Sequence, residues 1–215
     1  MFASESDGSL LISELTLRKA VGLLGVALPV ILAMGCWLRG GCTTLESSIS
    51  AYYGTDMRDV FVGVLFAIAL FMFSYRGYEW IDEVAGKVAC VCALGVALFP
   101  VTSPVTWVPR VHFTLAALLF VTFSYFSLCL FTRTDSPGHL SPQKVWRNRV
   151  YIVCGIAMLA FIAFIGVYYL FGTGTWLARL EPVFWLESFT LWAFGISWGV
   201  KGEAIPRLND PREIA

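Results

Sequence analysis

The organisation of this chain is clearest around one polar, charged run, Glu46-Ser47-Ser48-Ile49-Ser50-Ala51-Tyr52-Tyr53-Gly54-Thr55-Asp56-Met57-Arg58-Asp59, which lies between two long apolar blocks. Its last residues lead directly into the second block. Charged side chains at the end of a membrane span cost free energy when they are buried without a partner. The run therefore predicts a loop that joins two membrane helices and carries groups for binding or chemistry.

The composition of the whole chain agrees with this interpretation. Of its 215 residues, 58% are apolar and only 14% are charged, whereas soluble domains carry about 25% charged residues. We therefore expect an integral membrane protein. The formal net charge is zero, and no basic patch with interleaved aromatic residues is present, which argues against nucleic acid as a partner.

Six apolar segments are long enough to approach the roughly 20 residues that a membrane span needs. They are Ala20–Leu38, Asp59–Tyr75, Val84–Val101, Val111–Phe131, Val150–Phe171 and Val183–Val200. The predicted fold is all-α, a polytopic bundle of six transmembrane helices. We expect a tail or surface helix at 1–19, the membrane domain at 20–200 and a second tail at 201–215.

The distribution of Lys and Arg predicts the orientation of the bundle. With the N-terminus inside, the cytoplasmic set has eleven members, Arg18, Lys19, Arg76, Lys87, Arg133, Lys144, Arg147, Arg149, Lys201, Arg207 and Arg212, and the outer set has four, Arg39, Arg58, Arg110 and Arg179. Both termini are therefore expected in the cytoplasm, with a bacterial inner membrane as the expected location. The first apolar block is interpreted as an uncleaved span, and His139 as an ordinary residue of a cytoplasmic loop.

Two of the six cysteines flank the first outer loop. Cys36 and Cys42 could form a disulfide if this loop faces an oxidising space, and the sequence leaves this open. The other four cysteines lie in apolar blocks and are interpreted as small packing residues.

The predicted topology brings ionisable groups from three helices to one depth of the membrane. The first outer loop and the start of the second span supply Glu46, Ser47, Ser50, Tyr52, Tyr53, Asp56, Arg58 and Asp59, the fourth span supplies Arg110 and His112, and the sixth supplies Glu187 and Ser188. The cytoplasmic halves of these helices carry almost none. We therefore predict a polar pocket at the depth of the outer leaflet.

Four-residue spacing places several of these groups on faces of small residues that can approach a neighbouring helix. Such faces are Asp59–Gly63–Ala67, His112–Ala116 and Ser188–Gly195–Gly199. Glu187 lies beside the last face, and an acid one turn inside a span normally has a partner. The predicted partners are Arg58, Arg110 and His112.

A serine, a histidine and a carboxylate can act as nucleophile, base and orienting group. Ser50 or Ser47, His112, and Glu187 or Asp59 would form such a set, with Arg58 or Arg110 holding an oxyanion or a lipid phosphate. Binding roles are predicted for Glu46, Ser47, Tyr53, Arg58, Arg110 and Ser188. No GxSxG sequence supports the assignment.

A metal held by His112, Glu46, Asp59 and Glu187 is an alternative, although no paired histidine spacing is present. No metal or other cofactor is predicted, because a single intramembrane histidine does not suit a typical haem site and no lysine lies in the middle of a span.

Each candidate also has a purely structural interpretation. Asp56 and Asp59 fit the start of a helix, and the two arginines could extend to outer head groups. Tyr52, Tyr53, Trp107 and Trp176 fit an interfacial aromatic belt. His112 could be a hydrogen-bonded structural residue.

Several stretches resemble a known group of proteins. They are Ser48–Thr55 followed by Met57–Gly63, Val111-His112-Phe113, and Glu187-Ser188 with Phe194–Trp198. The chain resembles a bacterial six-span membrane family, a domain-of-unknown-function 998-like group that is distantly related to the DRAM/Sfk membrane proteins. The resemblance implies the six-helix topology, and the distant relatives point to lipid handling. It implies no established activity.

Three functions follow from this interpretation. The first is binding or processing of a membrane lipid, as a hydrolase or acyl transferase if the serine is reactive. The second is a non-enzymatic subunit or assembly factor whose charged cluster stabilises the fold and whose partner is a second copy or another membrane protein. The third is a transporter of small solutes, which the lack of polar groups in the inner half disfavours.

Overall fold

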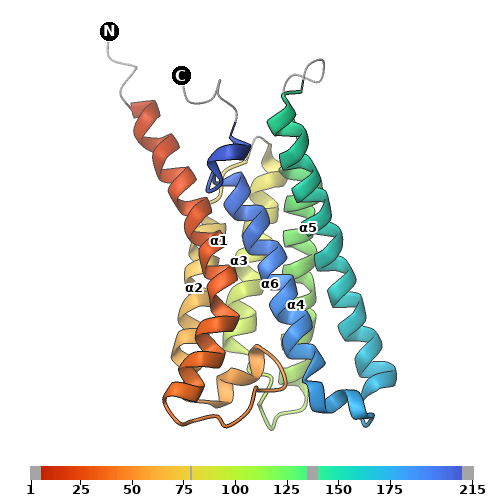
Figure 1. Ribbon diagram of the computed structural model, residues 1–215. Helices are drawn as coiled ribbons and strands as arrows, with labels where there is room; N and C mark the ends of the chain where they lie inside the picture. Colours follow the sequence, from red (N-terminus) through yellow and green to blue (C-terminus); the bar gives the residue numbers. More distant parts are fainter. Residues whose placement is uncertain (1–5, 78, 135–139, 210–215) are drawn as a thin grey trace.

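The computed structural model describes residues 6–77, 79–134 and 140–209. Six helices run side by side as one bundle (Figure 1). They are α1 (Ser6–Leu38), α2 (Arg58–Phe73), α3 (Trp80–Leu98), α4 (Trp107–Tyr125), α5 (Pro142–Val167) and α6 (Pro182–Lys201). The π-helical turns η2 (Phe126–Leu130) and η3 (Tyr168–Gly172) extend α4 and α5, and η1 (Ser50–Gly54), η4 (Trp176–Leu180) and η5 (Pro206–Leu208) are short 3₁₀ helices.

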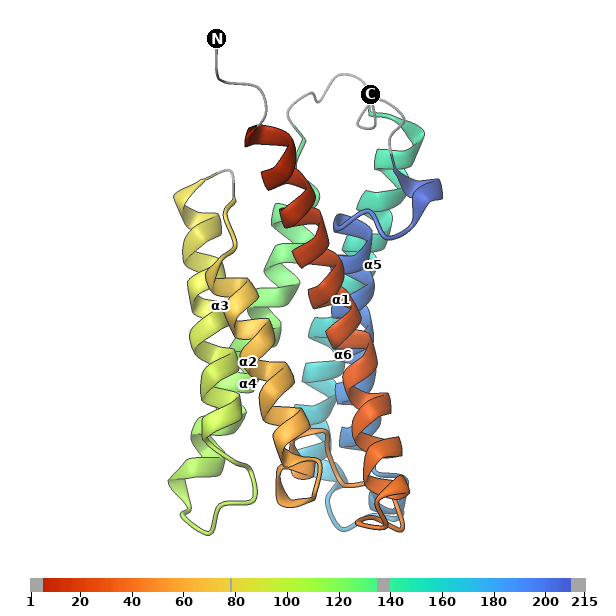
Figure 2. The same cartoon turned by 90° about the vertical axis from the view of Figure 1, so that its left-hand side faces the viewer.

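The helices alternate in direction, so that the start of α1 and the end of α6 lie at the same end of the bundle (Figures 1 and 2). We call this the terminal end. The connections from α1 to α2, from α3 to α4 and from α5 to α6 lie at the opposite end, which we call the loop end. The predicted all-α class is confirmed for the described residues, which contain no strand.

Three helical segments are long and apolar enough to cross a membrane, namely Glu14–Leu38, Trp107–Leu130 and Pro142–Gly172. They correspond to the first, fourth and fifth predicted spans. The α2 helix has only 16 residues, fewer than a span normally needs. The first half of α3 carries Asp82, Glu83 and Lys87.

Two helices begin well before the apolar blocks that predicted them. The α1 helix runs without a break from Ser6, so the predicted boundary at Ala20 is not a structural boundary. The α5 helix begins at Pro142, where the Ser141 side chain accepts a hydrogen bond from the Lys144 N–H at 3.0 Å. An N-cap serine followed by proline starts a helix independently of hydropathy. His139 lies outside the described residues.

Glycines set the contact between α1 and α6. A Cβ atom on Gly22 would lie 2.7 Å from the Gly195 carbonyl oxygen and 2.8 Å from the Gly199 nitrogen. The Trp192 indole N–H donates to the Val26 carbonyl at 3.1 Å across the same interface. The predicted packing role is therefore confirmed for Gly195, because only a residue without a side chain allows this approach. A Cβ atom on Gly199 would come no closer than 3.9 Å to the Ala204 side chain.

We expect Gly195→Ala to lower the free energy of unfolding by about 1–3 kcal/mol, because the new methyl group would lie 2.5 Å from the Gly22 carbonyl oxygen. Gly63→Ala on α2 is the matched control, since no atom lies within 4 Å of its added Cβ. Alanine there should be neutral or stabilising by up to about 1 kcal/mol. Thermal unfolding of the purified protein in detergent measures both. Equal effects of the two substitutions would contradict the close α1–α6 contact.

The prediction that Asp59, Gly63 and Ala67 face a neighbouring helix is wrong. Asp59 and Gly63 are exposed, and the space beside Gly63 is open. The buried side of α2 consists instead of four large residues, Phe61, Leu65, Ile68 and Met72, together with Ala69. These residues also recur at helical spacing, and their greater apolar area decides which face is buried.

Cys36 and Cys42 form a disulfide at the loop end, with their Cα atoms 5.3 Å apart. It joins the last turn of α1 to the start of the first loop. The other four cysteines, Cys90, Cys92, Cys129 and Cys154, are free. Of these, Cys129 is exposed, whereas the other three are buried as their predicted packing role requires.

We expect the unreduced, denatured protein to react with four equivalents of an alkylating reagent and the reduced protein with six, as measured by intact mass. Replacing both Cys36 and Cys42 with serine should lower the free energy of unfolding by about 2 kcal/mol, the chain-entropy value for a short loop. Cys90→Ser with Cys92→Ser is the control for alkylation, because this pair should remove two reactive thiols in both states. Six reactive thiols without reduction would contradict the disulfide.

Candidate functional site at the loop end

The first loop folds back against the loop end of the bundle (Figures 1 and 2). The part of the loop that packs against the helices is Ile49 with the 3₁₀ helix η1, and we call these residues, Ile49–Gly54, the plug. Ile49, Ser50, Ala51 and Tyr52 are buried. The Tyr52 ring lies 6.2 Å from the Phe184 ring of α6, and burial raises the pKa of the Tyr52 phenol above its usual value. The plug is thus packed against the helices as part of the core.

Glu187 of α6 holds the start of the plug. Its Oε2 accepts a hydrogen bond from the Ile49 N–H at 2.6 Å. The first N–H groups of a helix have no partner within the helix and favour a negative charge. Glu187 therefore caps η1 from a helix more than 130 positions away in the chain.

The prediction that an arginine or His112 pairs with Glu187 is wrong. Arg58 is exposed and instead donates to the Tyr53 hydroxyl at 2.8 Å, with its guanidinium 4.5 Å from the ring centre. Arg110 is exposed at the start of α4. The Ile49 N–H of the plug provides the charge-assisted donor that the carboxylate needs, so no arginine is required.

His112 is buried and bonded to the end of α3. Its Nδ1 lies 2.7 Å from the Phe99 carbonyl oxygen. The last carbonyls of a helix lack partners within the helix, and the imidazole supplies one. This contact matches the structural interpretation of His112.

A cavity of about 50 Å³ lies between the helices behind the plug. Its polar side chains are Ser50, His112 and Glu187, and its apolar walls come from α1, α2, α3, α4 and α6. Along α4 the wall runs from His112 to Phe123, which is about 16 Å of helix axis. Three of the four predicted catalytic residues therefore line one cavity, with the polar groups at its loop end.

The three side chains are not bonded to one another. Ser50 Oγ lies 3.2 Å from Ser48 Oγ, whereas His112 and Glu187 bond to the backbone groups described above. Within the described part of the chain no hydrogen bond links the serine to the histidine or the histidine to the carboxylate. Asp59 is exposed at the first turn of α2 and does not line the cavity. The arrangement lacks the contacts of a nucleophile–base relay.

The remaining predicted binding residues do not line the cavity. Ser47 is exposed, and the Glu46 N–H donates to the Tyr52 hydroxyl at 3.5 Å. Ser188 is buried, and its hydroxyl donates to the Phe184 carbonyl one turn earlier at 2.7 Å. Across residues 6–77, 79–134 and 140–209, no three His, Cys, Asp or Glu side chains are grouped so that they could hold a metal ion, which leaves the metal alternative without support.

The sequence analysis missed polar contacts at the terminal end. Asp82 of α3 is only 1% exposed, and its carboxylate accepts hydrogen bonds from Arg133 at 3.2 and 3.4 Å. Ser127 in the π turn after α4 lies 2.7 Å from Ser197 of α6, Oγ to Oγ. Glu79 at the N-cap of α3, three positions before Asp82, was the available signal, because this spacing is that of a capping box.

Comparison of the chain with protein-family models, with curated proteins and with solved structures finds no match. The resemblance to the six-span bacterial family therefore stays a prediction, and the function has to be argued from the geometry of the site.

Proposed function

We propose that this protein is a six-span membrane protein that binds the alkyl chain of a membrane lipid in the cavity behind the plug. Large apolar side chains on the outer faces of α2, α3 and α6, the helices outside the three apolar segments named above, support the six-span placement. Among them are Leu70 and Phe73 of α2, Val91 and Leu98 of α3, and Phe189 and Ile196 of α6, all at least 40% exposed. Such faces need a partner or lipid to cover them.

The proposed orientation places the terminal end in the cytoplasm and the loop end outside. The eleven-to-four distribution of Lys and Arg carries this assignment, and the disulfide at the loop end agrees with an oxidising space. For a bacterial cell this is the inner membrane with the loop end in the periplasm. The polar end of the cavity then lies at the depth of the outer leaflet.

The polarity of the cavity is the observation that carries the lipid proposal. Its loop end is lined by a carboxylate, an imidazole and a hydroxyl, and the rest is lined by Leu, Ile, Val, Ala and Phe side chains. This distribution suits a chain with a polar group at one end. The cavity has about 50 Å³, much less than the roughly 300–1,000 Å³ of ordinary ligand pockets. A lipid therefore enters only when the plug moves away from Glu187.

The polar groups are proposed to bind rather than to react. Glu187 and His112 are each occupied by backbone partners, and a head group would replace those partners when the plug moves. Hydrolysis would require Ser50 and His112 to meet in the lipid-bound state. No cofactor is part of the proposal.

Filling the cavity tests the proposal. Ala116 lines it, whereas the neighbouring Ala117 does not. We expect Ala116→Leu to reduce the lipid that co-purifies with the protein at least several-fold, and Ala117→Leu to leave it unchanged. Native mass spectrometry of protein extracted in mild detergent measures retained lipid directly. Equal lipid content in both variants and the wild type would overturn the cavity as the binding site.

A non-enzymatic structural subunit is the second candidate. The observation that favours it is that both ionisable groups of the site satisfy helix ends, Glu187 at η1 and His112 at α3. In that case the Ala116→Leu variant keeps the lipid content of the wild type. The partner would be a second copy of the chain or another membrane protein.

A further inference from the structure

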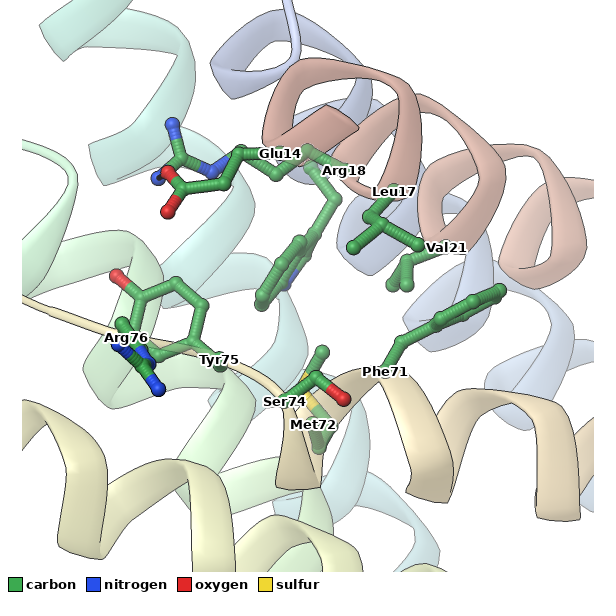
Figure 3. Close-up of a pocket in the computed structure, with 10 residues that line it drawn as sticks. Glu14, Leu17, Arg18, Val21, Phe71, Met72, Ser74, Tyr75 and Arg76 are labelled. Atoms are coloured by element: carbon green, nitrogen blue, oxygen red, sulfur yellow. Dashed lines mark hydrogen bonds and ion pairs between the residues drawn. The ribbon is translucent and has the colours of Figure 1, made fainter. Parts of the chain in front are cut away.

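A second cavity lies at the terminal end, opposite the end that holds the plug. It has about 30 Å³ and is bounded by α1, the end of α2 and α6. In Figure 3, Glu14 and Arg18 of α1 lie on one side, Ser74 after α2 lies on another, and Tyr75 and Arg76 follow it along the rim. An open groove of about 420 Å³ shares the segment Ser74–Arg76 with this cavity.

Trp198 of α6 lines the cavity and carries an unsatisfied donor. The residue is 1% exposed, and its indole Nε1 has no hydrogen-bond partner. Buried tryptophan N–H groups usually find an acceptor, and a buried donor without one is destabilising. Because the indole nitrogen can only donate, the missing partner has to be an acceptor.

Two arginines make the surroundings of this donor positive. Arg18 is partly buried and lies 3.3 Å from the Glu14 carboxylate. Arg76 is exposed on the rim, and among the described residues it has no carboxylate within 4.0 Å. In the groove, Lys87 and Glu83 lie 4.0 Å apart and offset each other's charge. The net excess of positive charge therefore lies at Arg76, beside the cavity.

We propose that the cavity and the adjoining groove bind a phosphate group. The cavity has room for an oxygen atom or two, and the groove has room for the rest of the group. One phosphate oxygen would accept from Trp198 Nε1, and the other oxygens would contact the guanidinium groups of Arg18 and Arg76, which suit phosphate geometry. The phosphate belongs to an anionic lipid at the cytoplasmic surface or to a small soluble phosphate ester, because both carry the same group.

The test uses the purified full-length protein. Native mass spectrometry in a mild detergent follows titration with phosphatidylglycerol in one arm and with glycerol 3-phosphate in the other. We expect Arg76→Gln to weaken phosphate binding about tenfold, the value for losing one charge-assisted contact. Arg149→Gln is the matched control, because Arg149 is exposed on α5 and stacks on Trp146 away from the cavity.

Two further variants separate a built site from general surface charge. Glu14→Gln removes the carboxylate beside Arg18 and should strengthen binding several-fold. Trp198→Phe removes the donor and should weaken it several-fold. Because Trp198 lies in the core, the Trp198→Phe variant is compared with the wild type only if both unfold at the same temperature. Arg76 is exposed, so its variant decides the proposal by itself.

The outcomes differ clearly. Binding in the lipid arm alone identifies the ligand as a lipid head group. Binding in both arms shows that the phosphate group is sufficient. Either result supports the site if Arg76→Gln weakens the binding. Equal weakening by Arg76→Gln and Arg149→Gln would overturn the proposal in favour of nonspecific attraction. Absence of binding in both arms would also overturn it. None of these results depends on the cavity behind the plug.

Discussion

Replacing Glu187 with alanine is expected to lower the free energy of unfolding by about 2–4 kcal/mol. The substitution leaves the buried Ile49 N–H without its acceptor, and it enlarges the adjoining cavity. A lost hydrogen bond to a charged group contributes about 1.5–3 kcal/mol, and the added empty space contributes the rest. The measurement is thermal unfolding in detergent, together with hydrogen exchange of the peptide that covers the plug.

Two comparisons sharpen this experiment. Glu187→Gln keeps a carbonyl oxygen that can still accept from Ile49, so it should be milder than Glu187→Ala. Asp59→Ala removes an exposed carboxylate at the same end of the bundle and should change stability by no more than about 0.5 kcal/mol. Faster exchange confined to the plug in Glu187→Ala would identify the carboxylate as its anchor. If Asp59→Ala and Glu187→Ala destabilised the protein equally, the capping role of Glu187 would be refuted.

The course of the chain could be predicted from hydropathy because every helix contains an apolar block. The ends of the helices could not, since hydropathy marks the residues that suit a membrane and not those that are helical. The α1 helix continues for 14 residues before Ala20, and α5 begins eight residues before Val150. Capping signals such as Ser141-Pro142 carry that information instead.

Ser50, His112 and Glu187 were predicted at one end of the bundle, and all three line the cavity. His112 and Glu187 lie near the ends of helices that alternate in direction, and Ser50 lies in a loop at the same end. Their partners were not predictable in the same way. Charged side chains were the predicted partners of Glu187, whereas the structure supplies the Ile49 N–H at the start of η1 for Glu187 and the Phe99 carbonyl at the end of α3 for His112. Backbone groups at helix ends are present in every helix, so no residue type marks them.

The terminal end was underestimated for a related reason. Arg133 was interpreted as one of many cytoplasmic basic residues, and Asp82 lies 51 positions earlier in the chain. Their contact depends on the packing of α3 beside α4 and on the course of the chain after η2. A charge count over loops predicts orientation but does not identify pairs. Asp82, the most buried acidic side chain in the ion pairs of the described residues, therefore lies at the terminal end, where no site was predicted.

Replacing Asp82 with alanine is expected to lower the free energy of unfolding by about 2–4 kcal/mol. Asp82 has two roles, since its carboxylate accepts from Arg133 and also completes the capping box at the start of α3 with Glu79. Losing a helix cap contributes about 1 kcal/mol. Removing one partner of a buried pair contributes more, although the 34% exposure of the Arg133 side chain reduces this part. Thermal unfolding measures the sum.

A double-mutant cycle separates the two roles. Asp82→Asn keeps an oxygen for the capping contact and removes the charge, and Arg133→Gln removes the cation alone. If the ion pair contributes, the loss from Asp82→Asn should be smaller in the Arg133→Gln background than in the wild type. Glu83→Ala is the surface control, because Glu83 is exposed and pairs with Lys87 at only 4.0 Å, so it should cost no more than about 0.5 kcal/mol. Strictly additive effects of Asp82→Asn and Arg133→Gln would show that the buried carboxylate stabilises α3 through its cap alone, and that Arg133 contributes no pairing energy.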